Sequence, residues 1–266
     1  MIDLAVCRAA VEDVRRVLEE LPGRSERERV LGRGEGGDET TAIDAAAERA
    51  ILERLDATGV DFTLVSEELG IRQSRDGGSR YVVLDPIDGS INAKRGIPFF
   101  SLSIAVADGP TMGDVDFGYV YDFGSGEEWS AVRGSGARLN GEPLRPPPPG
   151  RLELVSLEAT KTALVARHAA AVADVAPRVR VMGSLALSLC HLAAGRVDGV
   201  CSLRAARSVD IAAGQLVVTE VGFAVELPDA GPLAAAPLDL EGRSRIVAAA
   251  TKGQVASLAE ALGPLR

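Results

Sequence analysis

The stretch LDPIDGS, residues 84–90, ends an apolar run with two acids, a proline and a glycine. The residues before it, from Tyr81 to Leu84, are typical of a buried strand. Asp, Pro and Gly are all common turn formers, so a simple turn accounts for the stretch taken alone. Two carboxylates on one tight turn also suit a hard divalent cation, which prefers oxygen ligands. The surrounding sequence decides between these two interpretations.

The composition indicates a globular protein and argues against several partners. The chain has 266 residues, a hydrophobic fraction of 46% and a net charge of −9, which suits one large domain or two packed halves. Lys and Arg form no cluster, so we expect no nucleic-acid partner. Acids and arginines interrupt the N-terminal segment, and no apolar run approaches the roughly 18 residues of a membrane span. We therefore expect neither a signal peptide nor a membrane partner.

The number and spacing of the cysteines indicate the redox state of the compartment in which the protein works. Cys7, Cys190 and Cys201 are odd in number and lack CxxC spacing. A disulfide framework and a zinc site are therefore both improbable. We expect a reducing, cytoplasmic setting.

The first half of the chain has an α+β pattern. Apolar residues at helical spacing predict helices near 6–21 and 43–55, whereas the glycine-rich segment LGRGEGGDETT, 31–41, predicts a mobile loop. From FFSLSIAVA onward the apolar period changes to two, which predicts an antiparallel meander. An Asn-Gly pair at Asn140 predicts a hairpin turn within it.

A proline run marks the expected boundary between two halves. RPPPPG, 145–150, excludes a helix or a central strand. We divide the chain into an N-terminal α+β half, 1–147, and a C-terminal α/β half, 148–266. In the second half, strands such as LELVS alternate with helices near 184–195 and 208–221. The fold class predicted for the whole chain is α/β.

Acids recur where predicted strands end or helices begin. These acids are Glu67 and Glu68 after TLVS, Asp85 and Asp88 after YVVL, and Asp210 at the start of a helix. Each alone fits a helix cap or a solvated charge. Together they suit two Mg²⁺ ions about 3.5–4 Å apart, which stabilise both oxygens of a phosphoryl transfer. Backbone N–H groups of Gly89 and Ser90 suit a phosphate if the next segment is helical.

Three motifs resemble the signature of a known superfamily. SEE (66–68), DPIDGS (85–90) and VDIAAG (209–214) resemble, in order and spacing, those of the inositol monophosphatase superfamily. GGDETTAID and SLRAARSVDIAAG look like its archaeal members, which hydrolyse inositol monophosphate and fructose 1,6-bisphosphate. The resemblance implies a layered α/β/α/β/α sandwich, a homodimer, and a Mg²⁺-dependent phosphomonoesterase with two or three ions per site.

The resemblance also implies the metal ligands. Glu67, Asp85 and the backbone carbonyl of Ile87 would hold the first ion. Asp85, Asp88 and Asp210 would hold the second. A third, weaker site would involve Glu67, with the loop residue Asp38 nearby.

The remaining site residues implied by the resemblance act on water and substrate. Asp44 and the Ser90 hydroxyl would orient the water at the first ion, with Glu67 also counted as catalytic. Asp88 and the amides of Gly89 and Ser90 would contact the phosphate ester. Gly183, Ser184 and Leu185 would line the sugar side.

Two departures from the family pattern concern the substrate. Val209 stands where the family commonly has Trp, and Leu203 stands, by counting, where a family acid binds an inositol hydroxyl. Both weaken a prediction of strict inositol specificity. Arg204 and Arg207 are either surface charges or the groups that hold a second phosphate, for which a planar guanidinium is suited. Lys161 is a further candidate for that role.

Three functions stay open at this point. The leading one is a sugar phosphatase acting on inositol 1-phosphate and fructose 1,6-bisphosphate. The second keeps the mechanism but takes adenosine 3′,5′-bisphosphate or NADP, which requires a base pocket. The third is a non-catalytic metal- or phosphate-sensing protein, against which the complete set of acids argues.

Overall fold

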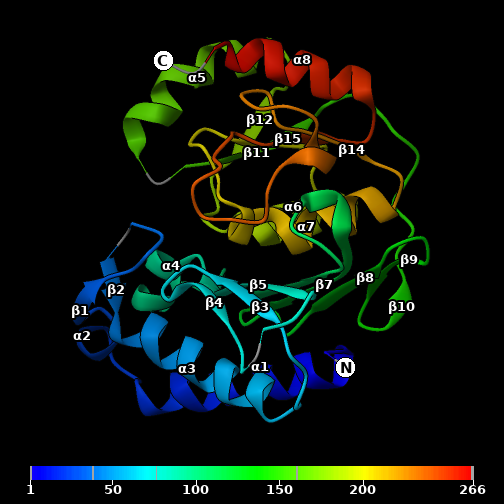
Figure 1. Ribbon diagram of the computed structural model, residues 1–266. Coiled ribbons are helices and arrows are strands. Elements are labelled where there is room, and N and C mark those ends of the chain that lie inside the picture. Colours follow the sequence, from blue (N-terminus) through cyan, green and yellow to red (C-terminus); the bar gives the residue numbers. More distant parts are fainter. Residues whose placement is uncertain (1, 38, 76, 160, 265–266) are drawn as a thin grey trace.

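The computed structural model describes residues 2–37, 39–75, 77–159 and 161–264, and these form five alternating layers (Figure 1). Helices make up the two outer layers and the central one: α1 (Leu4–Glu20) with α3 (Ala42–Asp56), α6 (Leu185–Ala193) with α7 (Ser208–Glu220), and α5 (Thr162–Ala173) with α8 (Lys252–Leu262). An eight-stranded and a five-stranded sheet separate them. This arrangement confirms the predicted α/β/α/β/α sandwich.

The eight-stranded sheet has the order β10-β9-β8-β7-β6-β5-β3-β4. Its strands are β3 (Thr63–Ser66), β4 (Gly70–Gln73), β5 (Tyr81–Asp88), β6 (Ser101–Ala107), β7 (Val115–Asp122), β8 (Glu128–Val132), β9 (Gly136–Leu139) and β10 (Glu142–Pro143). Only β3 and β5 pair in parallel among these neighbours. Asn140 and Gly141 join β9 to β10 with φ values of 53° and 82°, the geometry of a tight hairpin turn. The predicted meander and its Asn-Gly turn are therefore confirmed.

The five-stranded sheet has the order β12-β11-β13-β15-β14 and is mixed. Its strands are β11 (Leu154–Glu158), β12 (Arg178–Arg180), β13 (Gly199–Ser202), β14 (Ala224–Glu226) and β15 (Val247–Ala249). The pairs of β11 with β12 and with β13 are parallel, and β15 runs antiparallel to both its neighbours. Short helical segments complete the fold: α2 (Arg24–Arg27), α4 (Ser90–Arg95) and the 3₁₀ turns η1 (Met112–Asp114) and η2 (Leu233–Ala235).

Helix α7 joins the two parts of the molecule. It contacts β5, β6, β7 and β8 of the eight-stranded sheet, β14 of the five-stranded sheet, and α6 beside it in the central layer, which explains why nearly all its side chains are buried. A Cβ on Gly118 of β7 would lie 2.9 Å from the Ala213 carbonyl oxygen, so glycine permits this close approach. The largest core cluster combines residues from both sides of position 147, such as Trp129 and Val217. The division at 147 stays a prediction.

The glycine-rich segment 31–41 differs from expectation. It forms a hairpin of β1 (Val30–Arg33) and β2 (Glu39–Thr41), so the prediction of a loop throughout was wrong. Composition favours a loop locally and could not show the backbone pairing of the two strands.

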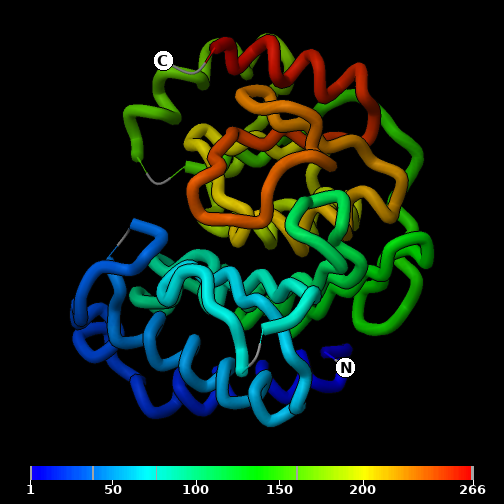
Figure 2. The backbone as a smooth tube through the Cα atoms, in the orientation of Figure 1, coloured from blue at the N-terminus to red at the C-terminus, as the bar shows by residue number. Residues whose placement is uncertain are grey.

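The chain begins and ends in opposite outer layers, with α1 in blue and α8 in red (Figure 2). Among the described residues, every helix is too short or too polar to cross a bilayer.

Candidate active site

Strand β5 carries two acids into the interior. Asp85 is 2% exposed, and its Oδ1 accepts a hydrogen bond of 3.0 Å from the Ile87 amide. Between Asp85 and Asp88 the register with β6 shifts, because Asp85 pairs with Ser103 but Asp88 pairs with Ser101. Residues three apart in a regular strand face opposite sides, and the extra residue of a bulge corrects this. The bulge therefore allows both acids to face the same region.

Three acids from distant parts of the chain converge. Glu67 follows β3, Asp85 lies on β5, and Asp210 lies in the first turn of α7. One carboxylate oxygen from each lies within 4.8 Å of the others. Such an all-oxygen set fits a hard divalent cation.

The electrostatics of the three acids support this fit. Burial, followed by the charges of Glu67, Asp88 and Asp210, raises the pKa of Asp85 well above its usual value. Burial also raises the pKa of Glu67 to about 8, against the lowering effect of Arg207. Ionising these acids therefore costs free energy in the absence of a cation, and a bound cation offsets that cost.

Asp88, the last residue of β5, contacts the start of α6. Its Oδ2 accepts hydrogen bonds from the Ser184 hydroxyl at 2.5 Å and the Ala186 amide at 2.8 Å. Burial raises its pKa to about 7, and the nearby charge of Asp210 adds to the effect. This contact brings Asp88 together with the predicted sugar-side segment, while its role as a metal ligand stays a prediction.

The turn after β5 depends on glycine. Gly89 has φ 90° and ψ 35°, a left-handed conformation that side chains disfavour. A Cβ there would also lie 3.1 Å from the carbonyl oxygens of Gly183 and Phe99. Gly89 thus lets the start of α4 lie directly against the predicted sugar-side segment. The next residue, Ser90, donates its hydroxyl to the Ile87 carbonyl at 2.9 Å.

Asp44 lies in the first turn of α3. Its two carboxylate oxygens differ in their hydrogen bonding. Its Oδ2 accepts from the Thr41 hydroxyl at 2.5 Å and lies 3.3 Å from Lys94 Nζ. Its Oδ1 is buried without a hydrogen-bond partner among the described residues. A buried carboxylate oxygen normally has a partner, so Oδ1 is suited to a bound water. Thr41 was missed, although Thr41-x-x-Asp44 before an apolar run has the spacing of a capping box.

The two predicted arginines have different surroundings. The Nη2 of Arg207 lies 2.7 Å from Glu67 Oε1 and 3.0 Å from Asp210 Oδ1, so this guanidinium contacts the acids themselves. Arg204 lines a cavity of about 150 Å³ together with Asp88 and Asp210. Arg207 lines the same cavity, but its guanidinium pairs with Glu67 and Asp210, so Arg204 is the better candidate for a group that contacts substrate.

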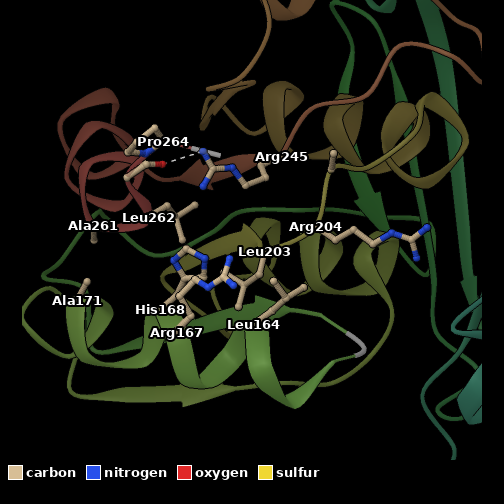
Figure 3. A pocket seen from close by; sticks show the side chains of 12 residues that line it. Leu164, Arg167, His168, Ala171, Leu203, Arg204, Arg245, Ala261, Leu262 and Pro264 are labelled. Carbon is tan, nitrogen blue, oxygen red and sulfur yellow. Dashed lines mark hydrogen bonds between the residues drawn. The ribbon is translucent and has the colours of Figure 1, made fainter. Parts of the chain in front are cut away.

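A second cavity, of about 520 Å³, lies between α5, the end of α8 and the segment around Leu203 (Figure 3). Leu203 is 2% exposed and lies there beside Leu164, whereas the Arg204 side chain extends away from the other labelled residues. Leu203, at the position predicted for an inositol-binding acid, thus lines this second cavity and not the 150 Å³ cavity beside Asp88 and Asp210.

Arg243 was missed by sequence reasoning. It lines the 150 Å³ cavity, and its Nη2 donates to the Gly36 carbonyl at 2.8 Å. No sequence signal marks it, because only the tertiary fold brings it to the β1–β2 turn. Lys161 directly precedes α5. Asp38, the possible loop ligand, lies outside the described residues.

The match to known proteins covers almost the whole chain. Residues 2–263 match the Inositol monophosphatase family. The chain belongs to this family. The family is metal-dependent, and the three converging acids could hold a metal ion.

Two archaeal relatives in the inositol monophosphatase family share a double name. The chain is 34% identical over 248 residues to the fructose-1,6-bisphosphatase/inositol-1-monophosphatase of Methanothermobacter thermautotrophicus, covering 90% of this chain and 88% of the relative. It is 34% identical over 252 residues to the protein of that name from Archaeoglobus fulgidus, covering 94% of each. It is also 37% identical over 192 residues to the Nus factor SuhB of Pasteurella multocida, covering 70% of each.

Solved structures share the same fold. A protein described as an inositol monophosphatase-fructose 1,6 bisphosphatase aligns with a TM-score of 0.83 and 26% identity, covering 98% of this chain and 100% of that one. The inositol monophosphatase of Thermotoga maritima aligns with a TM-score of 0.75 and 27% identity, covering 95% and 96%.

Proposed function

We propose that this chain is a Mg²⁺-dependent phosphomonoesterase that hydrolyses inositol 1-phosphate and fructose 1,6-bisphosphate. The observation that carries the proposal is the convergence of Glu67, Asp85 and Asp210 beside a cavity lined by arginines. The double name of the archaeal relatives supports this substrate pair. The family match supports phosphatase activity.

The proposed reaction uses the side chains around these acids. A divalent ion bound by Glu67, Asp85 and Asp210 would acidify a water molecule and offset phosphate charge. Thr41 and Lys94 hold Asp44 Oδ2, which leaves Oδ1 to accept a hydrogen bond from the attacking water. The N–H groups of the Gly89–Ser90 turn orient the phosphate oxygens.

The proposal includes two or three Mg²⁺ per site, a cytoplasmic location and a homodimer. Exposed apolar side chains support the dimer: Ile91 is 53%, Ile97 46% and Val181 45% exposed. They belong to neighbouring segments, because Asn92 Nδ2 donates to the Met182 carbonyl at 2.8 Å. A second copy that covers this face would bury them.

Phosphate release from a substrate panel tests the proposal. The panel contains inositol 1-phosphate, fructose 1,6-bisphosphate and adenosine 3′,5′-bisphosphate, each assayed with millimolar Mg²⁺ and with EDTA. We expect Mg²⁺-dependent release from the first two. A preference for adenosine 3′,5′-bisphosphate would indicate a nucleotide phosphatase with the same mechanism. No phosphate release from any substrate would support a non-catalytic sensing protein.

Replacing Ser90 with Ala should slow turnover without loss of metal binding. Its hydroxyl donates to the Ile87 carbonyl at 2.9 Å, and in this proposal it helps to orient the attacking water. Assistance by a positioned acid–base group is worth about 10²–10⁴-fold, and we expect the lower end of that range. Steady-state kinetics and calorimetric Mg²⁺ titration measure the two quantities, with Ser25→Ala on α2 as the control. Loss of Mg²⁺ binding would show that Ser90 acts on the metal site instead.

Replacing Arg204 with Met should separate the two substrates. Hydrogen bonds to charged groups contribute roughly 1.5–3 kcal/mol, so the KM for fructose 1,6-bisphosphate should rise about 10–100-fold. The KM for inositol 1-phosphate should rise far less, because that substrate lacks the second phosphate. The exposed Arg178 provides a matched control for Arg→Met. Equal increases for both substrates would exclude Arg204 as the second-phosphate group.

A further inference from the structure

Arg207 contacts both oxygens of one proposed metal ligand. Asp210 Oδ2 accepts from the Arg207 backbone amide at 2.7 Å and from Nε at 3.4 Å, and Oδ1 lies 3.0 Å from Nη2. The same Nη2 lies 2.7 Å from Glu67 Oε1. One guanidinium therefore bridges two of the three converging acids, which come from different layers of the fold.

The Arg207 guanidinium is enclosed as well as paired. The residue is only 8% exposed. A Cβ on Gly36 would lie 2.7 Å from Arg207 Nη1, so the β1–β2 turn closes one side of the guanidinium. That turn is fixed in place by the Gly36 amide, which donates to the Glu67 carbonyl at 2.8 Å. The turn therefore blocks one path away from the acids, while Arg207 also lines cavities of about 160 and 150 Å³.

A divalent ion would meet this fixed positive charge. Arg does not lose its proton in proteins. A cation that takes oxygens of Glu67 and Asp210 must therefore share them with a guanidinium or displace it. Like charges held in a poorly solvated site repel strongly.

We infer that Arg207 is a positioning residue that acts as a resident counter-ion and competes with the divalent metal for Glu67 and Asp210. It holds the two acids together across the layers and lowers the affinity of the site for metal. This inference rests on the proposed function, since it presupposes a metal at these acids.

Calorimetric Mg²⁺ titration at low ionic strength tests the inference without any turnover. Arg207→Met removes the charge and nearly keeps the length, and we expect it to bind Mg²⁺ at least about tenfold more tightly than the unmodified protein. Arg207→Lys keeps the charge and should stay within about threefold. Arg243→Met is the matched control, because Arg243 lines the same cavity but donates to the Gly36 carbonyl. We expect only a small effect from it.

The outcomes are distinct. Equal or weaker Mg²⁺ binding by Arg207→Met would overturn the inference, because Arg207 would then assist the metal. A similar gain in Arg243→Met would overturn it too, since any nearby positive charge would then suffice. If Arg207→Met fails to fold, Arg207→Gln serves in its place. Asp210→Asn separates this inference from the proposed function: if it binds Mg²⁺ as the unmodified protein does, the metal site itself is wrong.

Discussion

Asp85→Asn should lower kcat at least about 10³-fold and raise the melting temperature of the metal-free protein. A metal ion supplies several kcal/mol of transition-state stabilisation, and each 1.36 kcal/mol is tenfold in rate. Asp85 is the most buried of the three converging acids and lies on β5. Asn keeps the shape and can still accept from the Ile87 amide, but it lacks the charge.

The gain in stability has a separate cause. Burial and three neighbouring acids raise the pKa of Asp85, so its charged form destabilises the metal-free fold, and a neutral Asn avoids that cost. Steady-state kinetics and thermal melting in EDTA measure the two effects, with the exposed Asp56→Asn as the control. Near-normal turnover in Asp85→Asn would exclude it as a metal ligand.

Mg²⁺ should raise the melting temperature by roughly 5–10 °C. A ligand at 100 times its Kd adds about 2.7 kcal/mol, and each 1 kcal/mol shifts the midpoint of a chain this size by about 2–4 °C. Differential scanning calorimetry in EDTA and in millimolar Mg²⁺ measures the shift. An identical midpoint in both would contradict metal binding at this site.

The same experiment should depend on pH in a defined direction. The pKa of Glu67 is raised to about 8 and that of Asp88 to about 7, mainly by burial in both. An unfolded chain loses these protons near pH 4, so between about pH 5 and pH 8 the folded state holds more protons. In EDTA, stability should therefore fall as pH rises through this window.

Mg²⁺ should flatten the pH dependence but not remove it. A cation keeps its ligands ionised at every pH in the window. Glu48, whose pKa burial raises to about 7, instead accepts hydrogen bonds from the Ser66 hydroxyl and the Leu69 amide. The contribution of Glu48 to the pH dependence of stability should persist with Mg²⁺ and disappear in Glu48→Gln. A slope that stayed the same with and without Mg²⁺ would show that the titrating acids do not bind the metal.

Short-range sequence patterns predicted much of the fold. The two-residue period of β6, the helical spacing of α1 and α3, and the Asn140–Gly141 turn all come from neighbouring residues. The layered order of these elements came from the resemblance of three motifs. The β1–β2 hairpin was missed because its glycines favour a loop locally, while backbone pairing and its hydrogen bonds to Glu67 and Glu68 stabilise it.

The site was predictable where a motif fixes the local backbone. Asp85 and Gly89 lie within one turn, so their proximity follows from the chain itself. The contacts of Arg207 with Glu67 and of Arg243 with Gly36 join residues far apart in sequence. Such contacts depend on how layers pack, and residue type and spacing carry no information about them.

The three converging acids come from segments far apart in the chain, and this has a consequence for protein synthesis. Glu67 and Asp85 emerge from the ribosome early, but Asp210 arrives only with α7, after the whole eight-stranded sheet. A nascent chain that has completed that sheet still lacks one of the three acids of the proposed ion-binding site. Capture of the ion would then be a late event that reports a nearly finished polypeptide, and truncated products would compete poorly for the cellular pool of divalent ions.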